Sequence, residues 1–195
     1  MQLIGHRGVC GIEPENTLRS FKKAFDLGLK MIELDIHLVE ETLIVIHDST
    51  LDRTTNGVGS IYDKSLAELC SLDAGEGEKI PTLTEVIEIL PSDVTINIEM
   101  KGKGCAHALS QHLAPISHQC IVSSFHWDDL LTLKEICNEA KLGVLTRKLQ
   151  PWDIATKIEA ISVHPSIDFI DSKFVSTAHQ QKLKIYPKFV IKSWK

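Results

Sequence analysis

Acidic and apolar residues alternate through the segment Glu33-Leu34-Asp35-Ile36-His37. Because successive side chains of a β-strand point to opposite faces, Glu33 and Asp35 would share one face of a strand. Two acidic side chains within an apolar strand destabilise a protein unless they are paired or bind a cation. Hard divalent cations prefer oxygen ligands such as carboxylates. The pattern therefore favours a metal site, and the alternative is an edge strand whose acidic residues face solvent.

A second polar strand face is predicted in the segment 95–101, where Asn97, Glu99 and Lys101 alternate with apolar residues. Glu99 could complete a set of three carboxylates with Glu33 and Asp35. Lys101 would supply a compact positive charge suited to a phosphate group. The alternative is an exposed Glu99–Lys101 pair on an antiparallel strand.

Two further strand ends carry histidines. The segment GHRG at 5–8 combines His6, which can transfer protons near neutral pH, with Arg7, whose guanidinium fits phosphate oxygens. His47 follows the β-branched run Ile44-Val45-Ile46, which would deliver it to the end of a strand. Each signal is weak alone, because a structural role explains either histidine about as well.

Another strand end, Ser123-Ser124-Phe125, could line the same pocket, and packing in the core is the alternative. The five cysteines are scattered and odd in number, so we expect reduced thiols. No feature near Cys10 indicates an activated thiolate, which argues against cysteine catalysis.

Strands and helices must position these residues, and β-branched runs do alternate with amphipathic stretches along the chain. The predicted strands cover residues 3–5, 31–35, 43–47, 94–101, 120–125, 142–145, 161–164 and 183–191. The predicted helices cover residues 17–27, 65–69, 83–90, 106–113, 127–140, 153–160 and 176–183. Asn16 is a candidate cap for the first of these helices.

This alternation predicts an α/β protein with a largely parallel sheet, and roughly eight strands indicate a barrel of the TIM type. In such a barrel the active site lies at the carboxyl ends of the strands. No linker or repeat divides the sequence, so residues 1–195 are interpreted as one domain. The Gly- and Asp-containing segment 49–80 is interpreted as an insertion on the rim of the barrel.

The connection between the second and third predicted strands is short. Only residues 36–42 separate Asp35 from Leu43, too few for a crossover helix between parallel strands. If the chain doubles back near Glu40-Glu41, an antiparallel register would set Glu33 across from His47. Either geometry can bring the carboxylate and the imidazole together.

Composition limits the kinds of partner. The 195-residue chain has a net charge of -5 and no cluster of basic residues, which argues against nucleic-acid binding. No apolar run is long enough to span a membrane or to serve as a secretion signal, so we expect a cytoplasmic protein without stable membrane association. The sequence does not indicate an oligomeric state.

Taken in order, the motifs resemble those of the glycerophosphodiester phosphodiesterase family. The matching segments are GHRG at 5–8, PENT at 14–17, MIELDIHL at 31–38, VIHDSTLDRTTNGVG at 45–59, IPTLTEV at 80–86, NIEMK at 97–101 and VSSF at 122–125. Each motif is weak by itself, and the ordered set is highly specific.

The resemblance implies a (β/α)8 barrel with a small insertion after the third strand. It implies hydrolysis of glycerophosphodiesters, such as glycerophosphocholine or glycerophosphoethanolamine, to glycerol 3-phosphate and an alcohol. By matching positions, a Mg²⁺ or Ca²⁺ ion would be bound by Glu33, Asp35 and Glu99. The general acid and base would be His6 and His47. The residues that bind the phosphate and the rest of the substrate would be Arg7, Lys101, Ser124 and Phe125, while Glu15 would orient Arg7 or its loop.

Two other functions remain as alternatives to this hydrolase. The first is a catalytically idle protein that binds phosphate esters. The second is a related phospholipase that uses the same two histidines on lipid headgroups, against which the lack of a hydrophobic or basic membrane-docking segment counts.

The C-terminal segment departs from the family pattern. Members usually carry an aromatic-Thr-Val-Asn motif at the position of residues 183–191, followed by a further helix and strand. Here Pro187 lies within that segment, and proline cannot donate a hydrogen bond to a sheet. We therefore expect a barrel without its closing β–α unit, which is open, or is covered by another chain, or reflects a truncated or frameshifted sequence.

Overall fold

The computed structural model describes residues 3–147 and 150–187, and one sheet organises them. Its parallel strands are β1 (Gly5–His6), β2 (Met31–Val39), β4 (Thr95–Met100), β5 (Cys120–Ser124), β6 (Leu142–Thr146), β7 (Ser162–Pro165) and β8 (Lys184–Ile185). They are arranged in the order β1-β2-β4-β5-β6-β7-β8, and each pairs in parallel with its neighbour. The remaining strand, β3 (Thr42–Val45), pairs antiparallel with β2.

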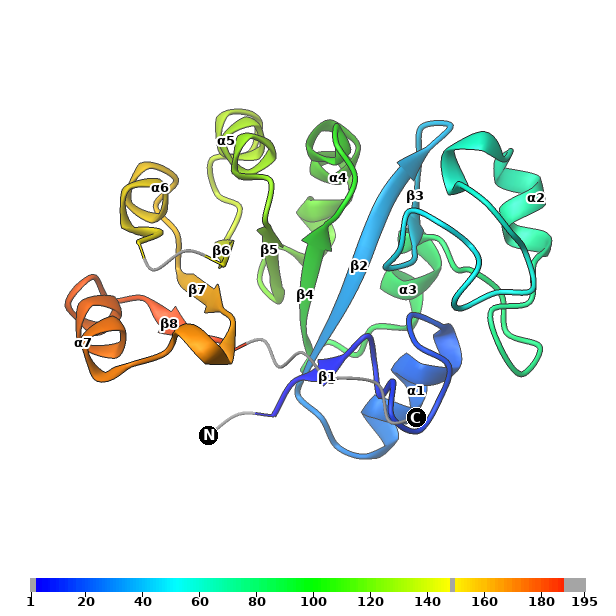
Figure 1. Cartoon of the computed structure of the whole chain (residues 1–195), viewed down its shortest axis with the longest axis horizontal. Coiled ribbons are helices and arrows are strands. Elements are labelled where there is room, and N and C mark those ends of the chain that lie inside the picture. Colours follow the sequence, from blue (N-terminus) through cyan, green and yellow to red (C-terminus); the bar gives the residue numbers. More distant parts are fainter. Residues whose placement is uncertain (1–2, 148–149, 188–195) are drawn as a thin grey trace.

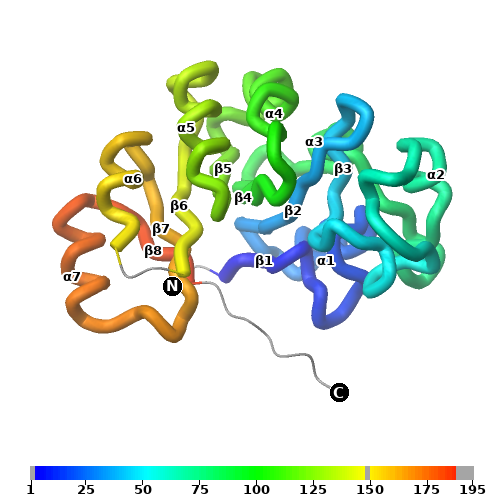
Figure 2. Tube along the Cα trace, turned by 45° about the horizontal axis from the view of Figure 1, so that its top comes forward, coloured from blue at the N-terminus to red at the C-terminus, as the bar shows by residue number. Residues whose placement is uncertain are grey.

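The sheet curls into an arc with helices along its outer side (Figure 1). The helices are α1 (Leu18–Asp26), α2 (Leu66–Ser71), α3 (Leu83–Ile89), α4 (Cys105–Leu113), α5 (Trp127–Ile136), α6 (Trp152–Lys157) and α7 (Ser172–Gln180). In Figure 2, α4, α5, α6 and α7 follow one another around the outside of the arc. The predicted α/β architecture of the TIM type is thus confirmed in the form of an open half-barrel.

Three short 3-10 helices, η1 (Ile61–Asp63), η2 (Ala114–Ile116) and η3 (Ile167–Phe169), complete the elements of the described residues. Helix ends follow local sequence signals. Thr82 caps α3 and Ser65 caps α2, each in a capping box with the glutamate three residues later. The N-cap of α1 is Thr17, whose hydroxyl accepts a hydrogen bond from Ser20 N, and not Asn16 as predicted.

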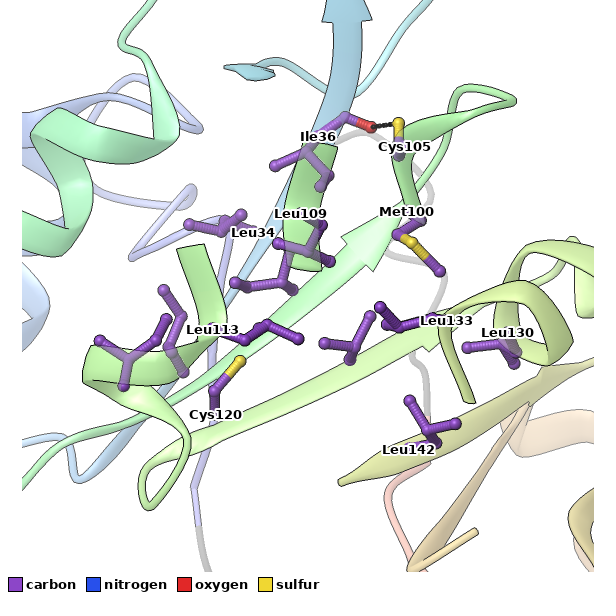
Figure 3. Packing of buried hydrophobic residues seen from close by; sticks show 14 of the residues in the cluster. Leu34, Ile36, Met100, Cys105, Leu109, Leu113, Cys120, Leu130, Leu133 and Leu142 are labelled. Carbon is purple, nitrogen blue, oxygen red and sulfur yellow. Dashed lines mark hydrogen bonds between the residues drawn. The ribbon is translucent and has the colours of Figure 1, made fainter. Parts of the chain in front are cut away.

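The main hydrophobic core fills the space between the sheet and the helices. Leu34, Ile36 and Met100 point from the strands toward Leu109 of α4 and Leu133 of α5 (Figure 3). This packing fixes the phase of each strand, because alternate side chains must then point to the inner side of the arc. The polar residues of β2 and β4 are therefore forced inward.

The short connection between β2 and β3 is a tight antiparallel hairpin, so the chain does double back at this point. Val39 pairs with Thr42, so Glu40 and Glu41 alone form the turn. The pairing of Ile36 with Val45 is one residue out of step with the predicted alignment of Glu33 and His47, and β3 ends before His47. β1 pairs with residues 32–33 of β2 and β3 with residues 36–39, so both share the edge of β2 opposite β4.

The segment between β3 and α3 carries η1, α2 and a hydrophobic cluster of its own. The cluster is formed by Val39, Ile44, Ile46, Leu51, Ile61, Leu69, Ala74 and Ile80. It anchors the segment on the inner face of the β2–β3 hairpin, because Val39 and Ile44 share the face of His37, next to the end of β3 that leads into His47.

The last predicted strand, 183–191, is shorter in the structure, where β8 covers only Lys184–Ile185. Tyr186 N still donates to Val163 O, and Pro187 follows. Residues 188–191 of the prediction lie outside the described residues. Among the described residues, no helix has the length and hydropathy needed to cross a bilayer.

Candidate active site

Three buried carboxylates meet on the inner side of the arc. Glu33 and Asp35 come from β2 and Glu99 from β4, with 6%, 0% and 1% of their surface exposed. One oxygen atom of each lies within 4.8 Å of the others. The register explains the meeting, because Asp35 is the direct neighbour of Glu99 and Glu33 lies one step earlier on the same face.

Two cationic side chains contact this carboxylate trio, as we call Glu33, Asp35 and Glu99. Arg7 Nε lies 3.3 Å from Asp35 Oδ2, and the backbone N–H of Arg7 donates to Glu33 Oε2 at 3.0 Å. Lys101 Nζ lies 3.1 Å from Glu99 Oε1 and 4.0 Å from Asp35 Oδ1. The cations partly offset the negative charge of the trio and would also face an anionic ligand bound next to it.

Arg7 is held from behind by Glu15. Its Nη1 donates to Glu15 Oε1 at 2.7 Å, as the role predicted for Glu15 requires. Although burial alone would lower it, Asp35 and Glu15 raise the pKa of Arg7. The backbone of Arg7 has a φ of 52°, a left-handed conformation that is rare for a side chain of this size. Such local strain is typical of functional sites, and here it lets the Arg7 amide reach Glu33.

Arg53 connects the Arg7 side of the site with the His47 side. Its two Nη atoms each donate to a Glu15 oxygen at 2.8 Å, and its Nε donates to Asp48 Oδ2 at 2.5 Å. Burial alone would raise the pKa of Asp48, but Arg53 and His47 lower it to about 2. Asp48 is therefore ionised at any pH near neutrality.

His47 has a defined hydrogen bond at each ring nitrogen. Its Nδ1 donates to Asp48 Oδ1 at 2.5 Å, since a carboxylate can only accept. Its Nε2 lies 3.1 Å from Lys101 Nζ, which can only donate. This arrangement places the proton of a neutral His47 on Nδ1 and leaves Nε2, on the side of Lys101 and Glu99, as a proton acceptor.

His6 lies next to Glu33, the member of the carboxylate trio farthest along β2 from Lys101 and His47. Its Nε2 lies 3.8 Å from Glu33 Oε2, and its Nδ1 lies 3.9 Å from Cys10 Sγ. The two imidazoles thus adjoin different ends of the trio, His6 through Glu33 and His47 through Lys101 and Glu99. Burial raises the pKa of the Cys10 thiol, which agrees with its predicted lack of catalytic character.

The backbone of His47 is held by a third histidine, His37. His37 Nε2 donates to the carbonyl oxygen of His47 at 3.2 Å, and its Nδ1 then accepts from the Tyr62 hydroxyl at 2.7 Å. Burial lowers the pKa of His37, so the neutral form that this pattern requires is favoured. Tyr62 belongs to the segment between β3 and α3, so that segment reaches the site.

Asn16 orients the most buried carboxylate. Its Nδ2 donates to Asp35 Oδ2 at 3.0 Å, and its Oδ1 accepts from the backbone N–H of Asp35 at 3.4 Å. Asn16 has a φ of 58°, which asparagine tolerates better than most residues. A residue expected to cap a helix therefore serves the site.

Of the two residues predicted to bind the substrate at the end of β5, Ser124 faces the helices and Phe125 lies next to Arg147. Ser124 points to the helix side of β5, where its hydroxyl donates to Met100 O and accepts from His126 N, and it does not reach the trio. Ser123, in register with Glu99, is the serine on the inner face. Phe125 directly follows the end of β5, with the Arg147 guanidinium 5.1 Å from its ring centroid.

Six residues with contacts in the site are not among the predicted catalytic, substrate-binding and metal-binding residues, namely Asn16, His37, Asp48, Arg53, Tyr62 and Ser123. Signals existed for some of them. Asp48 directly follows His47, and Arg53 belongs to the segment VIHDSTLDRTTNGVG. Tyr62 gave no signal, because its contact with His37 depends on how the segment folds over the hairpin.

A hollow of about 350 Å³ opens beside the trio on the inner side of the arc. Its walls include His6, Glu33, Asn97, Glu99 and Tyr186. Asn97 Oδ1 and Ser123 Oγ are buried and have no hydrogen-bond partner among the described residues. Buried polar atoms without protein partners are suited to a polar ligand or water.

The donor set fits a hard divalent cation. Three carboxylates within a few ångströms of one another are costly in a protein interior, and oxygen-only ligation is typical of Mg²⁺ and Ca²⁺. With a cation among them, the two imidazoles and two basic side chains next to the trio could bind an anionic ester and move protons to and from it.

Comparisons with known proteins agree with this chemistry. The profile of the Glycerophosphoryl diester phosphodiesterase family matches residues 6–187. A glycerophosphodiester phosphodiesterase of Caldanaerobacter subterraneus subsp. tengcongensis is 37% identical, over 95% of this chain and 84% of the relative.

Two solved structures are similar along most of their length. A phosphodiesterase of Oleispira antarctica, in complex with the product sn-glycerol-3-phosphate, has a TM-score of 0.86 and 30% identity, covering 95% of this chain and 83% of that one. The glycerophosphodiester phosphodiesterase of Thermotoga maritima has a TM-score of 0.82 and 28% identity, covering 96% of this chain and 85% of that one.

Proposed function

Because this chain belongs to the glycerophosphodiester phosphodiesterase family and is a phosphoric diester hydrolase, we propose that it converts glycerophosphodiesters to glycerol 3-phosphate and an alcohol. Glycerophosphocholine and glycerophosphoethanolamine are the first substrates to test. One observation carries the proposal, namely the meeting of three buried carboxylates with two imidazoles and two cations in one network of contacts.

Glu33, Asp35 and Glu99 would hold a divalent cation, either Mg²⁺ or Ca²⁺, through one oxygen atom each. When bound, such a cation offsets the negative charge of the phosphate in the transition state. Asn16 and Lys101 position two of these carboxylates, since they donate hydrogen bonds to Asp35 and Glu99.

The two histidines would divide the proton transfers between them. His47 is suited to accept a proton at Nε2, because Asp48 holds the proton of its neutral ring at Nδ1. His6 is suited to donate a proton from Nε2, the nitrogen that faces the Glu33 carboxylate. Positioned acid–base groups of this kind each contribute about 10²- to 10⁴-fold to rate. The nucleophile is either water or the glycerol hydroxyl next to the phosphate, and the second route passes through a cyclic phosphate.

Arg7 and Lys101 would bind the phosphate oxygens from two sides. Glu15 and Asp35 hold the Arg7 guanidinium in place, so little freedom is lost when a ligand binds. Phe125 would contact the substrate beyond the phosphate. We replace Ser124 by Ser123 in this proposal, because the hydroxyl of Ser124 is occupied by two backbone groups.

The test is to incubate the purified protein with glycerophosphocholine or glycerophosphoethanolamine and Mg²⁺ or Ca²⁺, and to follow products by ³¹P NMR. We expect glycerol 3-phosphate to accumulate and a chelator to stop the reaction until the ion is restored. His6→Ala and His47→Ala should each lower kcat by at least about 10²-fold. A transient cyclic phosphate signal would select the glycerol hydroxyl as nucleophile.

Lys22→Met, on the exposed face of α1, serves as the control for these variants and should retain full activity. Binding of a diester without turnover in the wild-type protein would instead support a phosphate-ester binding protein. Normal turnover by both histidine variants, with circular dichroism showing that they are folded, would contradict the proposed roles of His6 and His47.

A further inference from the structure

A second hollow, of about 560 Å³, lies at the mouth of the arc beside the carboxyl ends of β5 and β6. Its walls include Phe125, Trp127, Asp128 and Arg147. Leu145 borders both this hollow and the one that contains Glu33 and Glu99, so the two hollows adjoin. The second hollow is therefore placed to receive whatever part of a bound diester extends beyond the phosphate.

The strand geometry explains how its two main side chains reach the mouth. On β5, Ser123 is in register with Glu99, and Phe125 directly follows the last residue of the strand, Ser124. On β6, Leu145 borders the inner hollow, and Arg147 follows it two positions later. Phe125 and Arg147 thus lie directly beyond the carboxyl ends of the neighbouring strands β5 and β6.

The surroundings of Arg147 leave its hydrogen-bonding capacity for a ligand. Its guanidinium lies 5.1 Å from the centroid of the Phe125 ring, in the range of a cation–π contact. Among the described residues, no carboxylate lies within ion-pair distance of it, although Asp128 borders the same hollow. Trp127, in the same wall, is held to β6 because its Nε1 donates to Leu145 O at 3.0 Å.

A guanidinium held against an aromatic ring is suited to a carboxylate, which it can bind through two parallel hydrogen bonds. Asp128 offers the opposite charge on the other side of the same hollow. A ligand that carries both a carboxylate and an ammonium would complement both residues. A headgroup with only an ammonium would contact Asp128 and leave Arg147 without a partner.

We propose that this hollow is the subsite for the alcohol of the diester, and that Arg147 selects an alcohol bearing a carboxylate, as in glycerophosphoserine. The inference rests on the proposed diesterase function and names its preferred substrate class. Glycerophosphoserine and glycerophosphoethanolamine form a matched pair for the test, because they differ only by that carboxylate.

The experiment measures kcat/KM for both diesters with the wild-type protein, Arg147→Met and Arg147→Lys. We expect the wild-type protein to prefer glycerophosphoserine, and Arg147→Met to reduce that preference by about 10-fold or more through the lost charge-assisted bond. Activity on glycerophosphoethanolamine should change by less than about twofold, because Met keeps the apolar stem against Phe125. Arg147→Lys should retain part of the preference.

The outcomes separate this inference from the function on which it rests. If the wild-type protein cleaves both diesters and Arg147→Met leaves their ratio unchanged, the subsite assignment is wrong and the diesterase function stands. Equal loss of activity on both diesters in Arg147→Met would also overturn it, since Arg147 would then not discriminate between them. A wild-type protein that cleaves neither diester would contradict the proposed function itself.

Discussion

Single side chains in this site are held by partners that fix their orientation and charge. His47 illustrates this, because Asp48 binds its Nδ1 and Lys101 binds its Nε2. Asp48 is in turn held by Arg53, which also binds Glu15 behind Arg7. The proposed proton acceptor and the proposed phosphate clamp therefore share one network of charged residues, and a change in Asp48 or Arg53 should affect both.

Asp48→Asn tests the orienting role of the carboxylate. The amide can present its N–H to Nδ1 and favour the wrong tautomer of His47, so Nε2 would lose its accepting role. We expect kcat for diester hydrolysis to fall by about 10²-fold with a smaller change in KM. The matched control is Asp63→Asn in η1, which is exposed and should leave kcat unchanged. Unaltered kcat in folded Asp48→Asn would remove Asp48 from the mechanism.

Asp48→Asn should also change how the stability of the protein depends on pH. The pKa of Asp48 is about 2 in the folded protein, against an ordinary value of 3.8. A carboxyl whose pKa is lower in the folded than in the unfolded state stabilises the protein at pH values above the unfolded-state pKa. This contribution is lost as the pH falls toward the folded-state pKa. Urea unfolding should therefore show wild type more stable than Asp48→Asn at pH 5, with the difference shrinking between about pH 4 and pH 2. A difference independent of pH would contradict the lowered pKa.

The alternation of polar and apolar residues was enough to predict which acidic side chains share a strand face. It was not enough to predict the other residues that contact them. Glu33, Asp35 and Glu99 sit in long strands whose apolar residues fix the phase. Ser123 and Ser124 are adjacent at a strand end, where the sequence cannot distinguish the inner from the outer serine. Asn16 and Arg53 lie in loops, so their partners depend on tertiary contacts that periodicity does not contain.

At the scale of elements, the β2–β3 hairpin decides where His47 lies. Its two-residue turn has positive φ at both Glu40, 46°, and Glu41, 64°. Turns of this geometry favour Asn-Gly or Gly-Gly, so the usual sequence signal of a tight hairpin is missing here. The sequence therefore left the chain reversal open, and the alignment of Glu33 with His47 that a reversal would give differs from the observed register by one residue.

Glu41→Gly tests the strain in this turn. A left-handed conformation costs a non-glycine residue roughly 1–2 kcal/mol, and glycine adopts it freely. We expect the free energy of unfolding to rise by about 0.5–1 kcal/mol once the greater entropy of the unfolded glycine is included. Glu88→Gly, at an exposed position of α3, is the control and should lower it by about 1 kcal/mol. Destabilisation by both substitutions to a similar extent would show that the turn is not strained.

At the scale of the whole molecule, the packing of helices on the outer side of the sheet leaves polar chemistry for the inner side. The core between sheet and helices is continuous from Phe21 to Leu183, whereas the inner side holds the carboxylate trio and a hollow. The alternation of strands and helices predicted this division. The C-terminal end of the sheet was less predictable, because β8 is only two residues long and its place depends on pairing with β7.

The proposed chemistry requires that Glu33, Asp35 and Glu99 bind a divalent cation. The decisive measurement is thermal unfolding of chelator-treated protein during titration with Mg²⁺ or Ca²⁺. At an ion concentration 100 times Kd, binding adds about 2.7 kcal/mol of stability. For a chain of this size we expect Tm to rise by roughly 5–10 °C.

Glu99→Gln keeps the shape of the side chain and removes one anionic ligand, so it should abolish most of this rise while remaining folded. That pair of results would establish the carboxylate trio as the metal site. An unchanged Tm of the wild-type protein with both ions, or an equal rise in Glu99→Gln, would contradict it.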